Sequence, residues 1–108
     1  RKIYITNYSD GNILFDDFMK ISQLPCHYCK APPNNSHNKW IGKTTVKSTI
    51  DNGNFIYSGL DRLDSFKPHD LENVVPCCSI CNYAKLQMSV EEFKNWITKV
   101  YTHYILKD

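Results

Sequence analysis

Two Cys-x-x-Cys pairs are the residues whose types and spacing most clearly predict chemistry in this chain. They are Cys26 with Cys29, and Cys78 with Cys81. Each such turn presents two thiolates to one ion, and zinc binds four ligands in a tetrahedron. Closing the long segment between the pairs costs about 3–4 kcal/mol, whereas structural zinc contributes on the order of 10 kcal/mol. The sequence therefore predicts one structural zinc site with four cysteine ligands.

Other interpretations of the cysteines stay open. The thiols could be buried and free, or one pair could be a redox pair, which would leave the other pair unexplained. Cys77 follows an apolar run and is predicted to be a buried strand thiol. The alternative is that Cys77, rather than Cys78, binds the ion. His27 lies inside the first turn, where its side chain would point away from the ion, so we predict that it is not a ligand.

A second group of polar residues surrounds the second cysteine pair. Asp61 ends an apolar run, and Asn82 and Lys85 follow the last cysteine at helical spacing. Carboxylate and amide oxygens are ligands that magnesium prefers, and a lysine on the same helix face could hold a phosphate. These residues predict a small phosphate-cleaving site. The alternative is that Asp61 only forms a salt bridge with Arg62 or with a lysine.

The elements that must position these residues follow from turn signals and hydrophobic periodicity. The first dozen residues are turn-rich around Asp10-Gly11-Asn12. Asn52-Gly53 predicts a β-hairpin, and Ser89 with Glu92 predicts a capping box at the start of the last helix. The expected elements are a helix over 16–23, a loop over 31–39, strands over 43–50, 55–61 and 73–77, and helices over 79–86 and 89–106.

Composition sets the outer limits. A chain of 108 residues with 42% hydrophobic residues is expected to form one domain over 1–108. The net charge of +2 is compatible with a nucleic-acid partner but is too small to argue for one. No apolar stretch approaches the roughly 20 residues of a membrane span, and no signal-peptide pattern opens the chain. We therefore expect an intracellular protein that does not associate with a membrane. A flanking domain or a protein partner could contribute to nucleic-acid recognition.

At the residues named above, the chain resembles the HNH endonucleases, specifically the zinc-stapled ββα-metal group. The pattern of that group is Asp-His near the end of one strand, Asn-Val/Leu-Val-Pro in the next, and then Cys-x-x-Cys-Asn-x-x-Lys. The matching segments here are 61–62, 73–76 and 78–85, with 25–29 similar to the first zinc pair and 89–93 to the trailing helix.

The resemblance implies a fold and an activity. The fold would be α+β: a small ββα-metal (His-Me finger) domain with its core at about 55–86, a structural zinc site of four cysteines, a β-hairpin and flanking helices. Asp61 and Asn82 would bind a catalytic Mg²⁺ or Mn²⁺, Asn73 would pin the loop between the strands, and Lys85 would contact backbone phosphate. The activity would be metal-dependent hydrolysis of phosphodiester bonds in DNA, with double-stranded DNA as the expected partner.

One position departs from the family pattern. The histidine that follows the aspartate there, the general base, is Arg62 here, as in viral-type members with Asp-Arg-Ile/Leu-Asp. A guanidinium stays charged in proteins, and lowering its pKa to 7 would cost about 7 kcal/mol. Arg62 is therefore predicted to clamp phosphate or stabilise the transition state. The water could be activated by the metal, by His69 or by Asp64, although His69 could simply be solvated and Asp64 could only cap the loop.

Two further functions stay open. A nucleic-acid-binding module that kept the zinc fold and lost catalysis would explain Arg62, and it would bind in a salt-sensitive way without turnover. A zinc-stapled protein-interaction domain would suit the modest charge. The sequence does not distinguish DNA from RNA, and the segment 31–54 has no counterpart in the family pattern.

Overall fold

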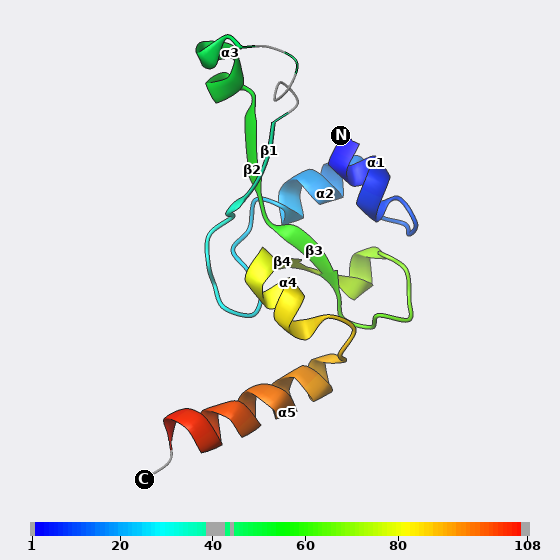
Figure 1. Ribbon diagram of the computed structural model, residues 1–108. Coiled ribbons are helices and arrows are strands. Elements are labelled where there is room, and N and C mark those ends of the chain that lie inside the picture. The colour runs from blue at the N-terminus through cyan, green and yellow to red at the C-terminus, as the bar shows by residue number, and fades with distance from the viewer. Residues whose placement is uncertain (1, 39–42, 44, 107–108) are drawn as a thin grey trace.

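The computed structural model describes residues 2–38, 43 and 45–106 and has an α+β fold with two antiparallel sheets of two strands each (Figure 1). The helices and strands are α1 (Lys2–Tyr8), α2 (Phe15–Ile21), β1 (Asn35–Asn38), α3 (Lys47–Asn52), β2 (Asn54–Tyr57), β3 (Gly59–Arg62), β4 (Val74–Cys77), α4 (Ser79–Lys85) and α5 (Val90–Val100). A 3₁₀ turn over Leu71–Asn73 precedes β4, and a π-helical turn over Tyr101–Ile105 follows α5.

The centre of the molecule is a strand–strand–helix unit formed by β3, β4 and α4. β3 and β4 pair antiparallel, with Gly59 opposite Cys77 and Asp61 opposite Val75. The adjacent valines of β4 suit an extended, half-buried strand because their β-branched side chains pack well on a pleated surface. Only Cys78 separates β4 from α4. The unit therefore places the end of β3 close to the residues that begin the helix.

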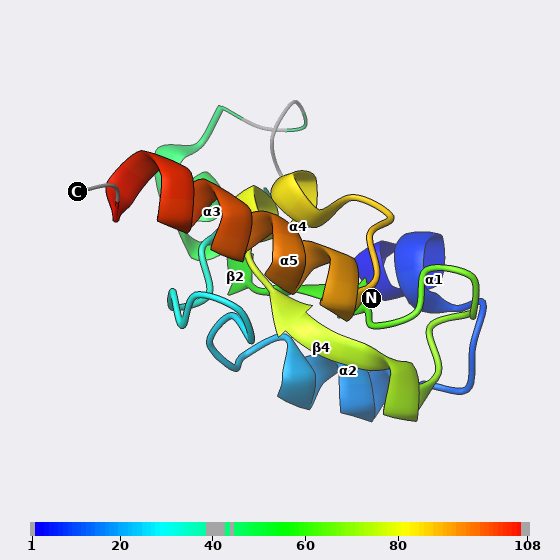
Figure 2. The same ribbon diagram turned by 90° about the horizontal axis from the view of Figure 1, so that it is seen from below.

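The main core lies between this unit and the two N-terminal helices. Its buried side chains are Ile3, Ile13, Phe18, Leu60 and Val74. Figure 2 shows α2 on one side of β4 and α5 on the other. Helix α1 was not predicted, because its sequence KIYITNY is rich in β-branched and aromatic residues. It forms here through packing on the core, since short helices depend mainly on tertiary contacts.

The β-hairpin differs from the predicted one. Its first strand is β1, within the predicted loop, and β1 pairs with β2. The strand expected over 43–50 is wrong: α3 occupies 47–52, while positions 39–42 and 44 lie outside the described residues. Alternation of β-branched residues favours a strand only where a partner strand is available, and here the turn before Gly53 closes as a helix, with Gly53 N–H bonded to Thr49 O at 3.1 Å. In Figure 1 the hairpin projects from the core with α3 at its tip.

The returning strand is also divided, because β2 and β3 belong to different sheets. Ser58 lies between them and is buried. Its N–H donates to Ser22 O at 2.7 Å, and its hydroxyl donates to Leu24 O at 2.7 Å. These two bonds to the segment after α2 replace the strand pairing, so the chain turns from one sheet into the other.

The capping box at the start of α5 is confirmed. Ser89 Oγ accepts a hydrogen bond from Glu92 N–H at 3.1 Å, and a Glu92 carboxylate oxygen accepts one from Ser89 N–H at 3.0 Å. Within α5 only Phe93 is buried, and its ring meets that of Tyr28 edge to face at 5.3 Å. Among the described residues, no helix has the length and apolar character needed to cross a membrane.

Candidate metal centre and adjoining pocket

The four predicted zinc ligands lie together. The sulfur atoms of Cys26, Cys29, Cys78 and Cys81 are all within 4.8 Å of one another, and those of Cys29 and Cys78 are 3.6 Å apart. A tetrahedral zinc ion with Zn–S bonds of about 2.3 Å holds its sulfurs about 3.8 Å apart. The cluster therefore fits a metal ion such as zinc.

Backbone hydrogen bonds bring the two pairs to one place. The first pair lies on a tight turn, in which Lys30 N–H donates to Cys26 O at 2.9 Å and Cys26 N–H to Ala31 O at 2.8 Å. Lys30 takes a left-handed conformation with φ of 66° to close it. His27 N–H then donates to Pro76 O at 2.8 Å, which joins this turn to β4 just before the second pair.

The electrostatics of the cluster favour a cation. Burial by itself would raise the pKa of Cys26, but backbone N–H groups at Cys78, Cys29 and Tyr28 lower it to about 6. Burial and the neighbouring sulfurs instead raise the pKa of Cys81. Adjacent thiolates repel one another, so all four can be ionised together only if an ion neutralises them.

The fifth cysteine is not part of this cluster. Cys77 is buried at the end of β4, and its Sγ donates to Cys78 O at 3.3 Å. Burial and the nearby negative charge of Asp61 raise the pKa of its thiol. His27 is exposed and likewise lies outside the group of four. Both residues have the roles that the sequence predicted.

A pocket of about 300 Å³ adjoins α4 and brings together four of the predicted site residues. These are Asp61 and Arg62 from β3, His69 from the loop before β4, and Asn82 from α4. Its complete lining is Asn7, Tyr8, Leu60, Asp61, Arg62, Ser65, His69, Asn82 and Leu86. The pocket is therefore assembled from β3, the loop that follows it, the helix and the N-terminal segment.

Asp61 is held from one side by a buried ion pair. Its Oδ2 accepts a hydrogen bond from Tyr28 OH at 2.7 Å and lies 3.0 Å from Lys85 Nζ. Burial, followed by the hydrogen bond to Asp61, raises the pKa of Tyr28, so the phenol remains a donor. Within the described part of the chain no hydrogen bond engages Asp61 Oδ1. That oxygen is left for the pocket.

Lys85 binds two groups of the protein itself. Its side chain is 0% exposed, and besides Asp61 its ammonium donates to Arg62 O at 3.0 Å. The ammonium is therefore engaged by protein groups, and the phosphate contact stays a prediction. The sequence alternative, a salt bridge between Asp61 and a lysine, is what the structure contains.

Asn73 holds the loop between β3 and β4, as the family pattern implied. Its amide nitrogen donates to Asp64 O at 3.1 Å and to Pro68 O at 3.0 Å, and its Oδ1 accepts from Asp64 N–H at 2.9 Å. The same loop holds Arg62, whose guanidinium donates to Lys67 O at 3.3 Å. Asn73 therefore acts on the pocket by fixing the segment that forms its wall.

The two candidate bases of the loop have different positions. Asp64 caps the loop, because its Oδ1 accepts from Phe66 N–H at 2.9 Å, and it is absent from the pocket lining. His69 lines the pocket, and its Nδ1 lies 2.7 Å from Asp10 Oδ1. Sequence analysis did not single out Asp10. The only local signal was the turn-forming Asp10-Gly11-Asn12 segment.

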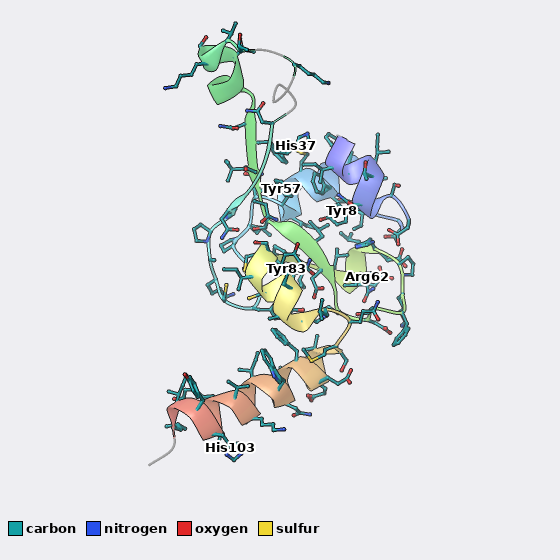
Figure 3. The ribbon with its side chains drawn as sticks, in the orientation of Figure 1. Tyr8, His37, Tyr57, Arg62, Tyr83 and His103 are labelled. Carbon is teal, nitrogen blue, oxygen red and sulfur yellow. The ribbon has the colours of Figure 1, made fainter. Side chains whose placement is uncertain are left out.

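A second hollow of about 340 Å³ continues from the pocket towards the hairpin. The two share Tyr8, Leu60 and Asn82, and the second adds Tyr57 and Tyr83. Tyr83 is 76% exposed, so its ring is open to solvent at the edge of this hollow. Figure 3 shows His37 on the hairpin and His103 near the C-terminus, both away from Arg62.

Comparisons of the chain with protein-family models, curated proteins and solved structures found no match. The resemblance to HNH endonucleases is therefore an expectation that rests on the sequence segments quoted above.

Proposed function

We propose that this protein is a metal-dependent HNH-type endonuclease that hydrolyses phosphodiester bonds in DNA. One observation carries the proposal: Asp61, Arg62, His69 and Asn82 come from three separate segments and line one pocket. Perturbed or chemically capable polar groups that converge in a cleft are typical of an active site.

The scaffold supports the same proposal. β3, β4 and α4 follow each other as strand, strand and helix, which is the order of the ββα-metal group. The cysteine cluster joins the start of this helix to the turn at 26–29. In the proposed function it holds zinc for structure, while the chemistry belongs to the pocket.

The pocket offers two oxygens to a divalent ion. They are the unengaged Oδ1 of Asp61 and the side-chain amide oxygen of Asn82, which is exposed on α4. This is a sparse donor set, of the kind that Mg²⁺ uses when waters and substrate phosphate complete its octahedron. When bound there, Mg²⁺ or Mn²⁺ would neutralise charge on the phosphate and stabilise the leaving oxygen.

The remaining residues bind and orient the substrate. Arg62 lines the pocket, and one guanidinium nitrogen donates to Lys67 O, so in this proposal its other donors bind a non-bridging phosphate oxygen. A guanidinium in this position stabilises charge that develops in the transition state. Lys85 holds Asp61 in place through its ammonium.

The test is cleavage of supercoiled plasmid by the zinc-loaded protein with Mg²⁺ or Mn²⁺, with an RNA of matched sequence as a second substrate. Asn82→Ala removes an exposed ligand and should reduce cleavage at least about 100-fold without unfolding the protein. Asn34→Ala, an exposed asparagine outside the pocket lining, is the matched control. The absence of cleavage with every divalent ion, or full activity in Asn82→Ala, would refute the proposal.

A second candidate function is favoured by the buried ion pair. Lys85 already neutralises Asp61 at 3.0 Å, and a neutralised carboxylate attracts a cation less strongly. The protein would then be a zinc-stapled module that binds nucleic acid and does not cleave it. This candidate predicts salt-sensitive binding that needs no divalent ion, whereas the endonuclease requires one for turnover.

A further inference from the structure

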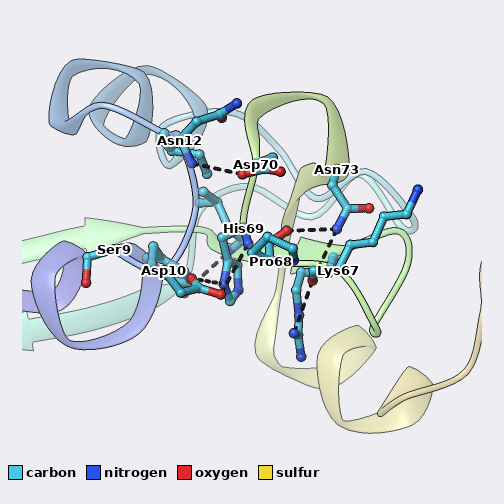
Figure 4. A network of polar contacts seen from close by, with 12 residues as sticks. Ser9, Asp10, Asn12, Lys67, Pro68, His69, Asp70 and Asn73 are labelled. Carbon is cyan, nitrogen blue, oxygen red and sulfur yellow. Dashed lines mark hydrogen bonds and ion pairs between the residues drawn. The ribbon is translucent and has the colours of Figure 1, made fainter.

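The N-terminal segment is fastened to the loop that carries His69. Asn12 N–H donates to Asp70 Oδ1 at 2.9 Å, and Asn12 Oδ1 accepts from Leu71 N–H at 2.8 Å. Gly11 lies so close to the loop that a Cβ there would overlap His69 O. Figure 4 shows Asn12 beside Asp70, and Asp10 beside His69. The segment is therefore bonded directly to the loop that brings His69 to the pocket.

Asp10 binds the imidazole of His69 where this segment meets the loop. Asp10 Oδ1 lies 2.7 Å from His69 Nδ1, and Asp10 Oδ2 accepts from His69 N–H at 3.3 Å. The ring also meets the Tyr8 ring edge to face at 5.1 Å. Burial alone would raise the pKa of Asp10, but the hydrogen bonds and charge of His69 lower it. Asp10 is therefore a carboxylate at neutral pH.

A carboxylate only accepts hydrogen bonds, so in the neutral imidazole the proton resides on Nδ1. Nε2 then keeps its lone pair. The His69 side chain is only 15% exposed and lines the pocket together with Arg62 and Asn82. An oriented imidazole whose Nε2 bonds to no other described residue, in a pocket that also contains an arginine, has the geometry of a general base.

We propose that His69, positioned by Asp10, is the general base of the site, and that it takes over the duty that Arg62 cannot perform. The inference rests on the proposed function. Nε2 takes a proton from a water molecule, whose oxygen forms a new bond to phosphorus. The bond from phosphorus to the leaving sugar oxygen breaks, and that oxygen departs with the electron pair. Asp10 stabilises the imidazolium until its proton passes to solvent.

The alternative is that Asp10 and His69 only lock the loop. The two roles differ in what they predict, because a lock would affect folding and DNA binding whereas a base affects the rate after binding. Asp10 is a positioning residue in the proposal, since it reaches the substrate only through His69. The other charged groups of the pocket are Arg62 and the Asp61–Lys85 pair, whose hydrogen bonds, within the described residues, go to partners other than the ring.

The first experiment needs no catalysis. Long-range ¹H–¹⁵N NMR spectra of the zinc-loaded, magnesium-free protein at about pH 8, above the usual pKa of histidine, report which ring nitrogen carries the proton. His69 should show a protonated Nδ1 and an unprotonated Nε2, and Asp10→Asn should change this signature while exposed His103 keeps its own. Equal populations of both tautomers of His69 in the unmodified protein would overturn the positioning role.

The second experiment measures the rate of single-turnover cleavage. DNA affinity is measured separately, with Ca²⁺ in place of Mg²⁺. His69→Ala should lose about 10²–10⁴-fold in rate with unchanged DNA affinity and melting temperature, and added imidazole should restore part of the rate. Asp10→Asn should lose less and keep the same affinity. Asp16→Asn, an exposed aspartate at the start of α2, is the matched control.

The outcomes separate the inference from the function on which it rests. Normal cleavage by His69→Ala, together with loss of cleavage in Asn82→Ala, would refute the base and leave the endonuclease standing. A loss that imidazole does not restore and that matches a fall in DNA affinity would also refute the base. No cleavage by the unmodified protein would remove both proposals.

Discussion

The cysteine cluster and the pocket use the same strand–strand–helix unit but differ in completeness. Cys78 and Cys81 lie at the beginning of α4, and Asn82 is the next residue. The cluster supplies four like ligands, all within 4.8 Å of one another. The pocket supplies one carboxylate oxygen that no described residue bonds, and one amide, together with an arginine and a histidine.

This difference suggests that the two regions have different roles, one structural and one in ligand binding. Four converging sulfurs satisfy a zinc ion without help from outside the chain. In the proposed function, two hard oxygens leave most of an octahedron to water and phosphate, so the pocket would bind its ion together with substrate. The cluster would then stabilise the fold, whereas the pocket would be completed by a ligand. Substitutions in each region and at the boundary between them test whether the two roles are separate.

The largest effect should come from the cluster. Cys29→Ser or a strong chelator should abolish the cooperative melting transition, because structural zinc contributes on the order of 10 kcal/mol, comparable to the whole stability of a small domain. Cys77→Ser, next to the cluster but outside it, should cost far less. Calorimetry with measured zinc content tests this. A retained transition after zinc removal, or equal damage from both substitutions, would contradict the assignment of ligands.

A smaller effect is expected at the boundary between the regions. Lys85→Met keeps the apolar stem and removes the charge, so Asp61 stays buried at 6% exposure without its partner. Breaking a buried pair in this way costs about 3–5 kcal/mol. Urea denaturation should show the loss, and the double substitution with Asp61→Asn should recover part of it. Additive losses in the double variant would show that the pair is not coupled.

The smallest effect should separate the regions most cleanly. Asn73→Ala removes four hydrogen bonds to the loop at 64–68 and should cost about 1–3 kcal/mol. When cobalt replaces zinc in the cluster, the visible absorption of Asn73→Ala should match that of the unmodified protein, while its plasmid cleavage should fall. A changed cobalt spectrum would mean that the loop and the cluster are one structural unit.

The sequence correctly predicted those parts of the site that depend on the spacing of neighbouring residues. The Cys-x-x-Cys turns, Asn82 one residue after Cys81, and the capping box at Ser89 depend on residues a few positions apart, and all have the expected local placement. Helical periodicity also placed Lys85 near Asn82. It could not show that two acceptors, Asp61 and Arg62 O, draw the ammonium inward.

The parts that sequence missed depend on distant partners. Asp10 and His69 are 59 positions apart, and nothing in either neighbourhood predicts their meeting. Helix α1 depends on the core that it covers. The strand expected over 43–50 had the right alternation and no partner, because β1 pairs with β2 instead. Propensity predicts an element, but the rest of the fold decides whether it forms.

One tyrosine connects the cysteine cluster to the pocket. Tyr28 lies between the first two cysteines in sequence, and its hydroxyl ends on Asp61. An ion bound by the four cysteines would fix the turn at 26–29 and, through the phenol of Tyr28, would also fix the position of Asp61. Occupancy of the cluster and the shape of the pocket are therefore linked through one aromatic side chain.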